Sequence, residues 1–142
     1  MSDRTCLLDT NVIIYLYSND EHDKNLIADA LINEQNIVIT RQVVNEICNV
    51  LIRKYSKSPA DVRNVLTELK QIPVLELTDR ITWKTLDLIE RHHFSYWDSM
   101  LIASALENNC EILYTEDLQN GQIIENRLKI VNPFIVKRKP KQ

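Results

Sequence analysis

Four acidic side chains occupy positions from which the sequence could bring them together to do chemistry. Asp9 directly follows an apolar run that ends at Leu8, and Asp117 follows another apolar run near the C-terminus. Asp98 begins a strongly apolar segment, and Glu46 borders the apolar side of an amphipathic one. Grouped carboxylates raise one another's pKa unless a cation compensates them, so such a cluster implies shared protons or a bound metal ion.

A metal ion held by these side chains would be a hard cation. Carboxylate oxygens select Mg²⁺, with Mn²⁺ as the alternative, and neither Cys nor His falls in the turns concerned, so zinc is disfavoured. Such ions can activate water, orient a phosphodiester and stabilise the leaving oxygen of an in-line displacement. We therefore expect Asp9, Glu46, Asp98 and Asp117 to be the metal ligands and catalytic residues of a nuclease.

Each of the four residues also has an ordinary structural explanation. Asp9 could form an Asx turn, Asp98 could cap its helix, Asp117 could be a loop residue, and Glu46 could be a solvated helix charge. The chain has twenty acidic residues, so four at suitable positions are unsurprising. Only the combination of all four favours a shared site.

The hydrophobic pattern predicts the elements that must position these residues. Short apolar runs predict strands, and segments with apolar residues at helical spacing lie between them. The predicted strands cover residues 5–8, 37–39, 74–77, 112–114 and 128–131. Because parallel strands need helical crossovers, this alternation predicts a three-layer α/β/α sandwich around a five-stranded parallel sheet. Ligands of such sheets bind outside the carboxyl ends of the strands, where Asp9 and Asp117 are expected.

The composition bounds the class of protein. A length of 142 residues with 44% hydrophobic and 26% charged residues is typical of one globular domain, which we expect to span residues 1–142. The net charge of −3 is unusual for a protein that coats nucleic acid. A nucleic acid would therefore have to bind at a local cluster of basic residues. Two such groups are visible, a tail at about residues 137–142 and the helical group Arg53, Lys54 and Lys57.

The N-terminal apolar stretch is too short, and too interrupted by polar residues, for a signal peptide or a membrane span. The sequence therefore predicts a cytoplasmic protein without membrane association.

Four motifs together resemble one known family. The strings LLDTNVII, VVNEICNVL, YWDSMLIASAL and LYTEDLQNG follow one another over nearly the whole chain. In this order they resemble the PIN-domain nucleases, and especially the VapC toxins of bacterial toxin–antitoxin pairs. The resemblance implies a PIN-like sheet, an acidic magnesium site and cleavage of single-stranded or loop RNA. It also aligns Asp9, Glu46, Asp98 and Asp117 with the acidic positions of the family.

The resemblance also assigns supporting residues. Asn11 and Thr115 match polar supporting positions; Asn11 can hydrogen-bond in the turn after Asp9, and the Thr115 hydroxyl can hold a carboxylate or a water. Glu116 adjoins Asp117 and could share its role. Neighbouring loop side chains usually point apart, so we favour Asp117 as the fourth acidic ligand while the choice stays open.

Stand-alone VapC-like proteins are typically homodimers silenced by a small antitoxin. The resemblance therefore implies a homodimer, a cognate antitoxin and an RNA target, for which transfer RNA is one candidate. Candidates for the antitoxin surface are Tyr15, Tyr17, Ile52 and Tyr55, although such residues more often belong to a core.

Two other functions compete with the nuclease. An aspartate-dependent phosphatase of the haloacid dehalogenase type also places an Asp after its first strand, but that family shows Asp-x-Asp where this chain has Asp-Thr-Asn. A non-catalytic RNA- or protein-binding module on the same fold is the other alternative, because fold alone does not establish function. The intact set of carboxylates favours the enzyme.

Overall fold

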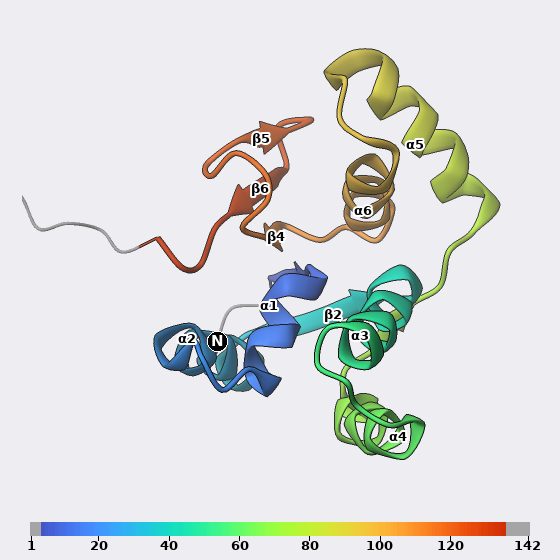
Figure 1. The fold of residues 1–142 in the computed structure, drawn as a ribbon. Helices are drawn as coiled ribbons and strands as arrows, with labels where there is room; N and C mark the ends of the chain where they lie inside the picture. The colour runs from blue at the N-terminus through green and yellow to red at the C-terminus, as the bar shows by residue number, and fades with distance from the viewer. Residues whose placement is uncertain (1–3, 136–142) are drawn as a thin grey trace, which may run out of the picture.

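The computed structural model describes residues 4–135 (Figure 1). The basic tail predicted at about residues 137–142 lies outside the described residues. Helices and strands alternate through most of the chain, as the hydrophobic pattern predicts. In chain order the elements are β1 (Thr5–Leu8), α1 (Thr10–Ile14), the 3₁₀ turn η1 (Tyr15–Tyr17), α2 (His22–Glu34), β2 (Asn36–Thr40), α3 (Arg41–Arg53), α4 (Pro59–Glu68), the 3₁₀ turn η2 (Leu69–Gln71), β3 (Val74–Leu75), α5 (Asp79–His92), α6 (Tyr96–Glu107), β4 (Ile112–Tyr114), β5 (Ile123–Ile124) and β6 (Leu128–Val131).

The strands form one sheet in the order β3-β2-β1-β4-β6-β5. The five predicted strands, β1 to β4 and β6, all pair in parallel, which confirms that part of the prediction. The predicted number of strands is wrong by one, because β5 adds a sixth, antiparallel strand at the edge beside β6. Strand β5 can pair with β6 because a tight turn joins the two strands, and in this turn Glu125 and Asn126 adopt positive φ angles. A pattern of apolar residues does not reveal such a turn.

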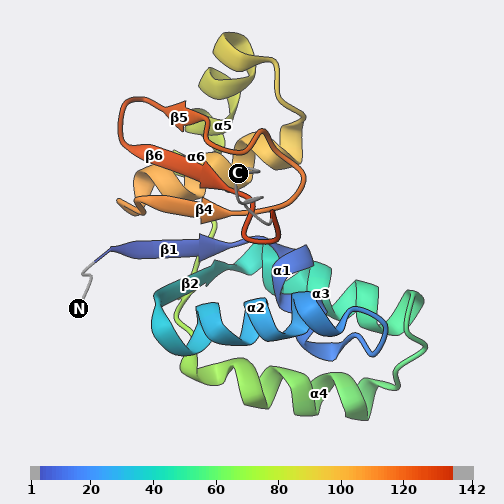
Figure 2. The same ribbon diagram turned by 90° about the vertical axis from the view of Figure 1, so that its left-hand side faces the viewer.

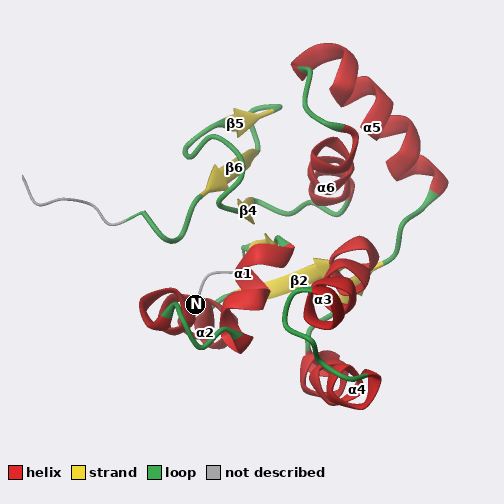
Figure 3. Cartoon of the chain, in the orientation of Figure 1, coloured by secondary structure: helices red, strands yellow, loops and turns green. Residues whose placement is uncertain are grey.

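Helices cover both faces of the sheet, as predicted for a three-layer sandwich. Helix α2 lies over one face beside β1 and β2, whereas α6 lies on the other face beside β4, with α5 packed against the outer side of α6 (Figures 1 and 2). The distribution of helix and strand in Figure 3 shows the same layering. Helix α6 is buried at every position from Ser99 to Leu106, as a helix that is apolar nearly all round must be.

Local polar residues fix where the helices begin. Thr40, Ser58 and Thr78 each accept a hydrogen bond from the backbone N–H three residues further on, as N-caps do. Ser58 also forms a reciprocal capping box with Asp61. Within residues 4–135, no helix has the length and apolar character needed to cross a membrane.

The strand order reverses between β1 and β4, and this point positions the candidate site. The chain first moves outward from β1 through β2 to β3, then returns to place β4 on the other side of β1. The backbone N–H of Asp9 donates to Tyr114 O at 3.0 Å, and that of Thr115 donates to Val131 O at 3.0 Å. The turns after β1 and β4 are therefore adjacent at the carboxyl edge of the sheet, where ligands of such folds bind.

Candidate active site

The carboxylate of Asp9 is held from two sides. Asp9 is the N-cap of α1, and its Oδ1 accepts a hydrogen bond from the Thr10 N–H at 2.7 Å. Its Oδ2 accepts one from the Thr115 hydroxyl at 2.7 Å. Burial raises the pKa of Asp9 to about 6, although the two hydrogen bonds lower it. The negative charges of Asp117 and Glu46 add to the rise.

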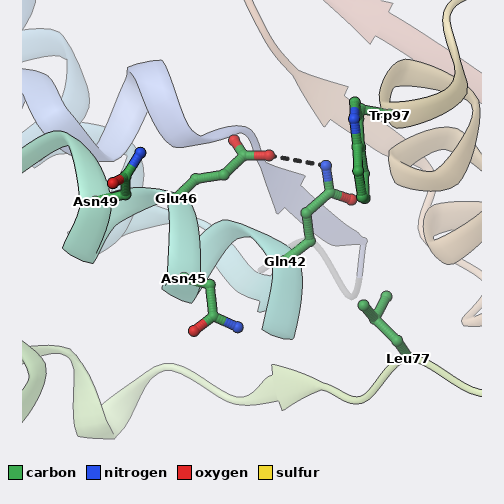
Figure 4. Close-up of a pocket in the computed structure, with 6 residues that line it drawn as sticks. All are labelled: Gln42, Asn45, Glu46, Asn49, Leu77 and Trp97. Atoms are coloured by element: carbon green, nitrogen blue, oxygen red, sulfur yellow. Dashed lines mark hydrogen bonds between the residues drawn. The ribbon is translucent and has the colours of Figure 1, made fainter.

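Glu46 is joined to the Asp9 turn through Thr10. The Thr10 hydroxyl donates to Glu46 Oε2 at 2.6 Å, across 36 positions of the sequence. Gln42, one helical turn before Glu46 on α3, donates from Nε2 to Glu46 Oε1 at 2.8 Å (Figure 4). Our sequence interpretation missed both partners. The spacing of four residues between Gln42 and Glu46 is a signal that could have found the second.

Asp117 is held by the two predicted supporting residues. Asn11 Nδ2 donates to Asp117 Oδ2 at 3.0 Å, and the Asp117 backbone N–H donates to the Thr115 hydroxyl oxygen at 3.2 Å. Burial raises the pKa of Asp117, and the nearby charges of Glu116 and Asp98 raise it further. Thr115 therefore bridges the Asp9 side chain and the Asp117 backbone, and it holds a carboxylate as expected.

Glu116 differs from Asp117 in its partners. Its Oε1 accepts a hydrogen bond from the Tyr15 hydroxyl, and its Oε2 pairs with Lys24 Nζ on α2 at 3.1 Å. A carboxylate that already has its own cation is less available to bind a second one. The geometry therefore favours Asp117 over Glu116 as the fourth acidic ligand, the choice that the sequence left open.

Asp98 lies in the first turn of α6, where its backbone N–H donates to the N-cap hydroxyl of Ser95 at 3.2 Å. Its side chain is only partly buried, and its charge acts on Asp117. The following residue, Ser99, is fully buried, and its Oγ has no hydrogen-bond partner. The start of α6 thus brings a carboxylate to the same sheet edge as the other three.

The four carboxylates form an electrostatically linked group. Asp9 interacts with Glu46 and Asp117, and Asp117 in turn interacts with Asp98. Within the described part of the chain, none of the four makes an ion pair with Lys or Arg. The side-chain oxygen of Asn11 is also buried without a hydrogen-bond partner.

These features fit a divalent cation for two reasons: the available ligands are oxygen atoms, and their negative charge is not compensated by the described residues. The coordination geometry itself is not preformed, because no three acidic, His or Cys side chains among residues 4–135 lie close enough to hold one ion together.

Two hollows flank this group. One, of about 410 Å³, is lined by Glu46 and other α3 side chains together with Leu77 and Trp97 (Figure 4). The other, of about 200 Å³, contains Thr10, Asn11 and Lys54 among its lining residues. Thr10 of the smaller hollow is hydrogen-bonded to Glu46 of the larger one, so the two hollows are neighbours.

A family model described as "PIN domain" matches residues 6–123, most of the chain and all four carboxylates. The chain belongs to the PIN-domain family. Membership supports the expected nuclease chemistry and weighs against the aspartate-dependent phosphatase. No curated protein sequence is significantly similar to this PIN-domain chain.

Several solved structures have the same fold, and some of them come from toxin–antitoxin systems. A toxin–antitoxin complex from Klebsiella pneumoniae is 19% identical, with a TM-score of 0.72 over 92% of this chain and 99% of that one. VapC20 of Mycobacterium tuberculosis, named as a toxin that cleaves the sarcin–ricin loop, is 16% identical, with a TM-score of 0.66 over 79% and 89%. VapBC2 from Rickettsia felis, bound to promoter DNA, is 17% identical, with a TM-score of 0.65 over 90% and 99%. These likenesses show that the PIN fold is shared.

Proposed function

We propose that this PIN-domain protein is a magnesium-dependent endoribonuclease that cuts single-stranded or loop RNA, and that it is the toxin of a toxin–antitoxin pair. The observation that carries the proposal is the group of four linked carboxylates at the strand switch point, with no Lys or Arg from residues 4–135 to neutralise it. Such a group is costly unless it serves to bind a cation.

In this proposal Asp9, Glu46, Asp98 and Asp117 would hold Mg²⁺, or Mn²⁺ in its place. The cation, when bound, would supply Lewis-acid stabilisation for the charge that develops on the phosphodiester. The protein's own contribution is orientation. The Thr10 N–H and the Thr115 hydroxyl fix the two oxygens of Asp9.

Glu46 and Asp117 are oriented in the same way. Thr10 and Gln42 donate to Glu46, and Asn11 donates to Asp117. Within residues 4–135 the buried side-chain oxygen of Asn11 has no hydrogen-bond partner, while its Nδ2 is committed to Asp117.

The RNA backbone would meet positive charge at the end of α3. Lys54 lines the smaller hollow beside Thr10 and Asn11, and Arg53 and Lys57 are exposed close to it in the sequence. This local basic group offers phosphate contacts that the net charge of −3 does not provide. We propose that Lys54 contacts a phosphate next to the one that is cut.

We also propose a homodimer and a small cognate antitoxin as partners. Structures of two fold relatives were determined as toxin–antitoxin assemblies, which supports a partner of this kind. Among the predicted candidates for the antitoxin surface, Ile52 on α3 is exposed, whereas Tyr15, Tyr17 and Tyr55 are partly buried against the core. Trp83 and Leu86 on α5 are further exposed apolar side chains. Light scattering after size exclusion tests the dimer, and co-purification with the product of an adjacent small gene tests the antitoxin.

Cleavage of a mixed pool of structured RNA, transfer RNA included, tests the activity. The protein is assayed with Mg²⁺, with Mn²⁺ and with EDTA, beside the variants Asp9→Asn and Asp98→Asn. Asp87→Asn, at an exposed position of α5, is the matched control. We expect metal-dependent cuts from the wild type and the control, and at least a hundredfold slower cleavage from both site variants.

Two results would contradict the proposal. If folded wild type cuts none of the RNAs but binds them, the non-catalytic RNA-binding module becomes the better function. If EDTA and both site variants leave cleavage unchanged, the carboxylates do not form the active site.

A further inference from the structure

The larger hollow beside Glu46 combines an aromatic surface with carboxamide side chains. Three of its lining residues, Gln42, Asn45 and Asn49, recur on one stripe of α3. The indole of Trp97 stands over the Gln42 end of this stripe (Figure 4). Trp97 is 60% exposed, and its indole contacts the Tyr96 ring edge-on at a centroid distance of 5.3 Å, so much of the indole surface is open beside the hollow.

The charge of the hollow argues against a phosphate. Neither Lys nor Arg is among its lining residues, and Glu46 brings a negative charge to it. The basic side chain near the site, Lys54, belongs to the other hollow. An uncharged flat group with polar edges therefore fits this hollow, whereas the sugar–phosphate backbone fits the other.

The carboxamides leave hydrogen-bonding atoms for such a group. Asn45 uses its Nδ2 to donate to Arg41 O at 3.2 Å, so its oxygen stays available as an acceptor. Asn49 is exposed on the same stripe. Gln42 donates to Glu46, and its own side-chain oxygen is buried with no hydrogen-bond partner among residues 4–135, so the exposed Asn45 and Asn49 are the side chains that a bound group could reach. Side chains that offer donors and acceptors beside an aromatic face are the elements that recognise unpaired bases.

We propose that this hollow binds one unpaired nucleobase next to the scissile phosphate, stacked on Trp97, with its edge read by Asn45 and Asn49. The proposal rests on the ribonuclease function proposed above. Glu46 lines the hollow and is also linked to Asp9 through Thr10, so a base bound here places its own phosphate beside the carboxylates. Trp97 and the two Asn residues then determine which sequence is cut.

Tryptophan fluorescence tests the stacking without requiring cleavage. The chain has two tryptophans, so Trp83→Phe leaves Trp97 as the sole reporter, and Trp97→Phe leaves Trp83 as the matched control. Both are made in the Asp9→Asn background and titrated in EDTA with single-stranded RNA octamers, and with the same octamers made abasic at single positions. We expect quenching of Trp97 that is lost for one abasic position, and little change at Trp83.

Kinetics test the consequence for specificity. Trp97→Ala is expected to weaken RNA binding and raise KM by about 5- to 150-fold, with a smaller effect on kcat, and Trp97→Tyr is expected to restore most of the loss. Asn45→Ala or Asn49→Ala should broaden the nucleotide preference at one position beside the cut.

These readouts separate the two proposals. Cleavage with unchanged KM and cut sites in Trp97→Ala would overturn the base-binding site while the nuclease function stands. Equal quenching by intact and abasic octamers would overturn it too. If Trp97→Ala changes the oligomeric state or antitoxin binding but leaves RNA affinity unaltered, the hollow is a protein contact instead. Base-dependent quenching of Trp97 in a protein that cuts no RNA would support the base site and contradict the nuclease.

Discussion

Replacing Asp9 by Asn is expected to stabilise the protein at neutral pH in the absence of metal, while it removes the proposed cleavage. In the folded protein, burial and neighbouring carboxylates raise the pKa of Asp9 from 3.8 to about 6. The charged form is therefore disfavoured by folding, and Asn resembles the neutral acid in shape and charge. The substitution keeps the hydrogen bonds feasible, because the Thr115 hydroxyl can accept as well as donate.

The size and the pH range of the effect follow from linkage. Below about pH 3.8 Asp9 is protonated in both states, so the variant and the wild type differ little. As the pH rises toward 6, the unfolded chain releases this proton first, and the wild type loses stability that the variant keeps. Above pH 7 the difference reaches its limit, about 3 kcal/mol for a rise in pKa from 3.8 to about 6.

Urea unfolding at several pH values between 4 and 8, in EDTA, measures this difference. Asp87→Asn, an exposed carboxylate on α5, controls for the change in net charge. Added Mg²⁺ should narrow the gap at pH 7.5, because it compensates the charge of Asp9 only in the wild type. The reasoning is refuted if the variant is less stable than the wild type at pH 7.5, or if the gap does not grow between pH 4 and pH 7.

Three further substitutions test other parts of the site. Thr115→Val leaves the buried Asp9 carboxylate without one donor, so the unfolding free energy should fall by about 2 kcal/mol in urea titrations. Thr82→Val, at an exposed position of α5, should change it by less than about 0.5 kcal/mol, and equal effects would contradict the role of the hydroxyl. Ser99→Ala removes a buried hydroxyl that has no partner, so thermal unfolding should show unchanged or slightly higher stability; a loss above about 1 kcal/mol would reveal a missed partner. Lys54→Ala, in the Asp9→Asn background, should weaken RNA binding and lower the slope of log affinity against log salt by about 0.7; an unchanged slope would exclude a phosphate contact.

The parts of the fold that depend on local patterns were predictable from the sequence. Apolar runs in the sequence located β1, β2, β4 and β6. These signals are local because one strand or one helix turn involves only a few neighbouring residues. The short edge strand β5 was missed, because its two residues become a strand only by pairing with β6.

The same distinction between local and long-range features applies to the candidate site. Asp9 could be proposed because it directly follows β1, and Asp117 because it lies in the loop after β4. Their role in catalysis remains a prediction. Thr10 could not be found, since its contact with Glu46 depends on how α3 packs against α1. The different surroundings of Asp117 and Glu116 depend likewise on Lys24, which reaches Glu116 across 92 positions of the sequence. Neither of these two contacts can be predicted from the spacing of residues in the sequence.

The long separation between the two halves of the site has a consequence for synthesis. Asn11 and Asp117 meet across 106 residues, and so do Asp9 and Thr115. A ribosome that has made Asp9 and Glu46 must still add β4 and its following loop before these contacts can form. A chain that stops before residue 117 lacks at least one of the four carboxylates, so the group can be assembled only after β4 and the loop that follows it have been made.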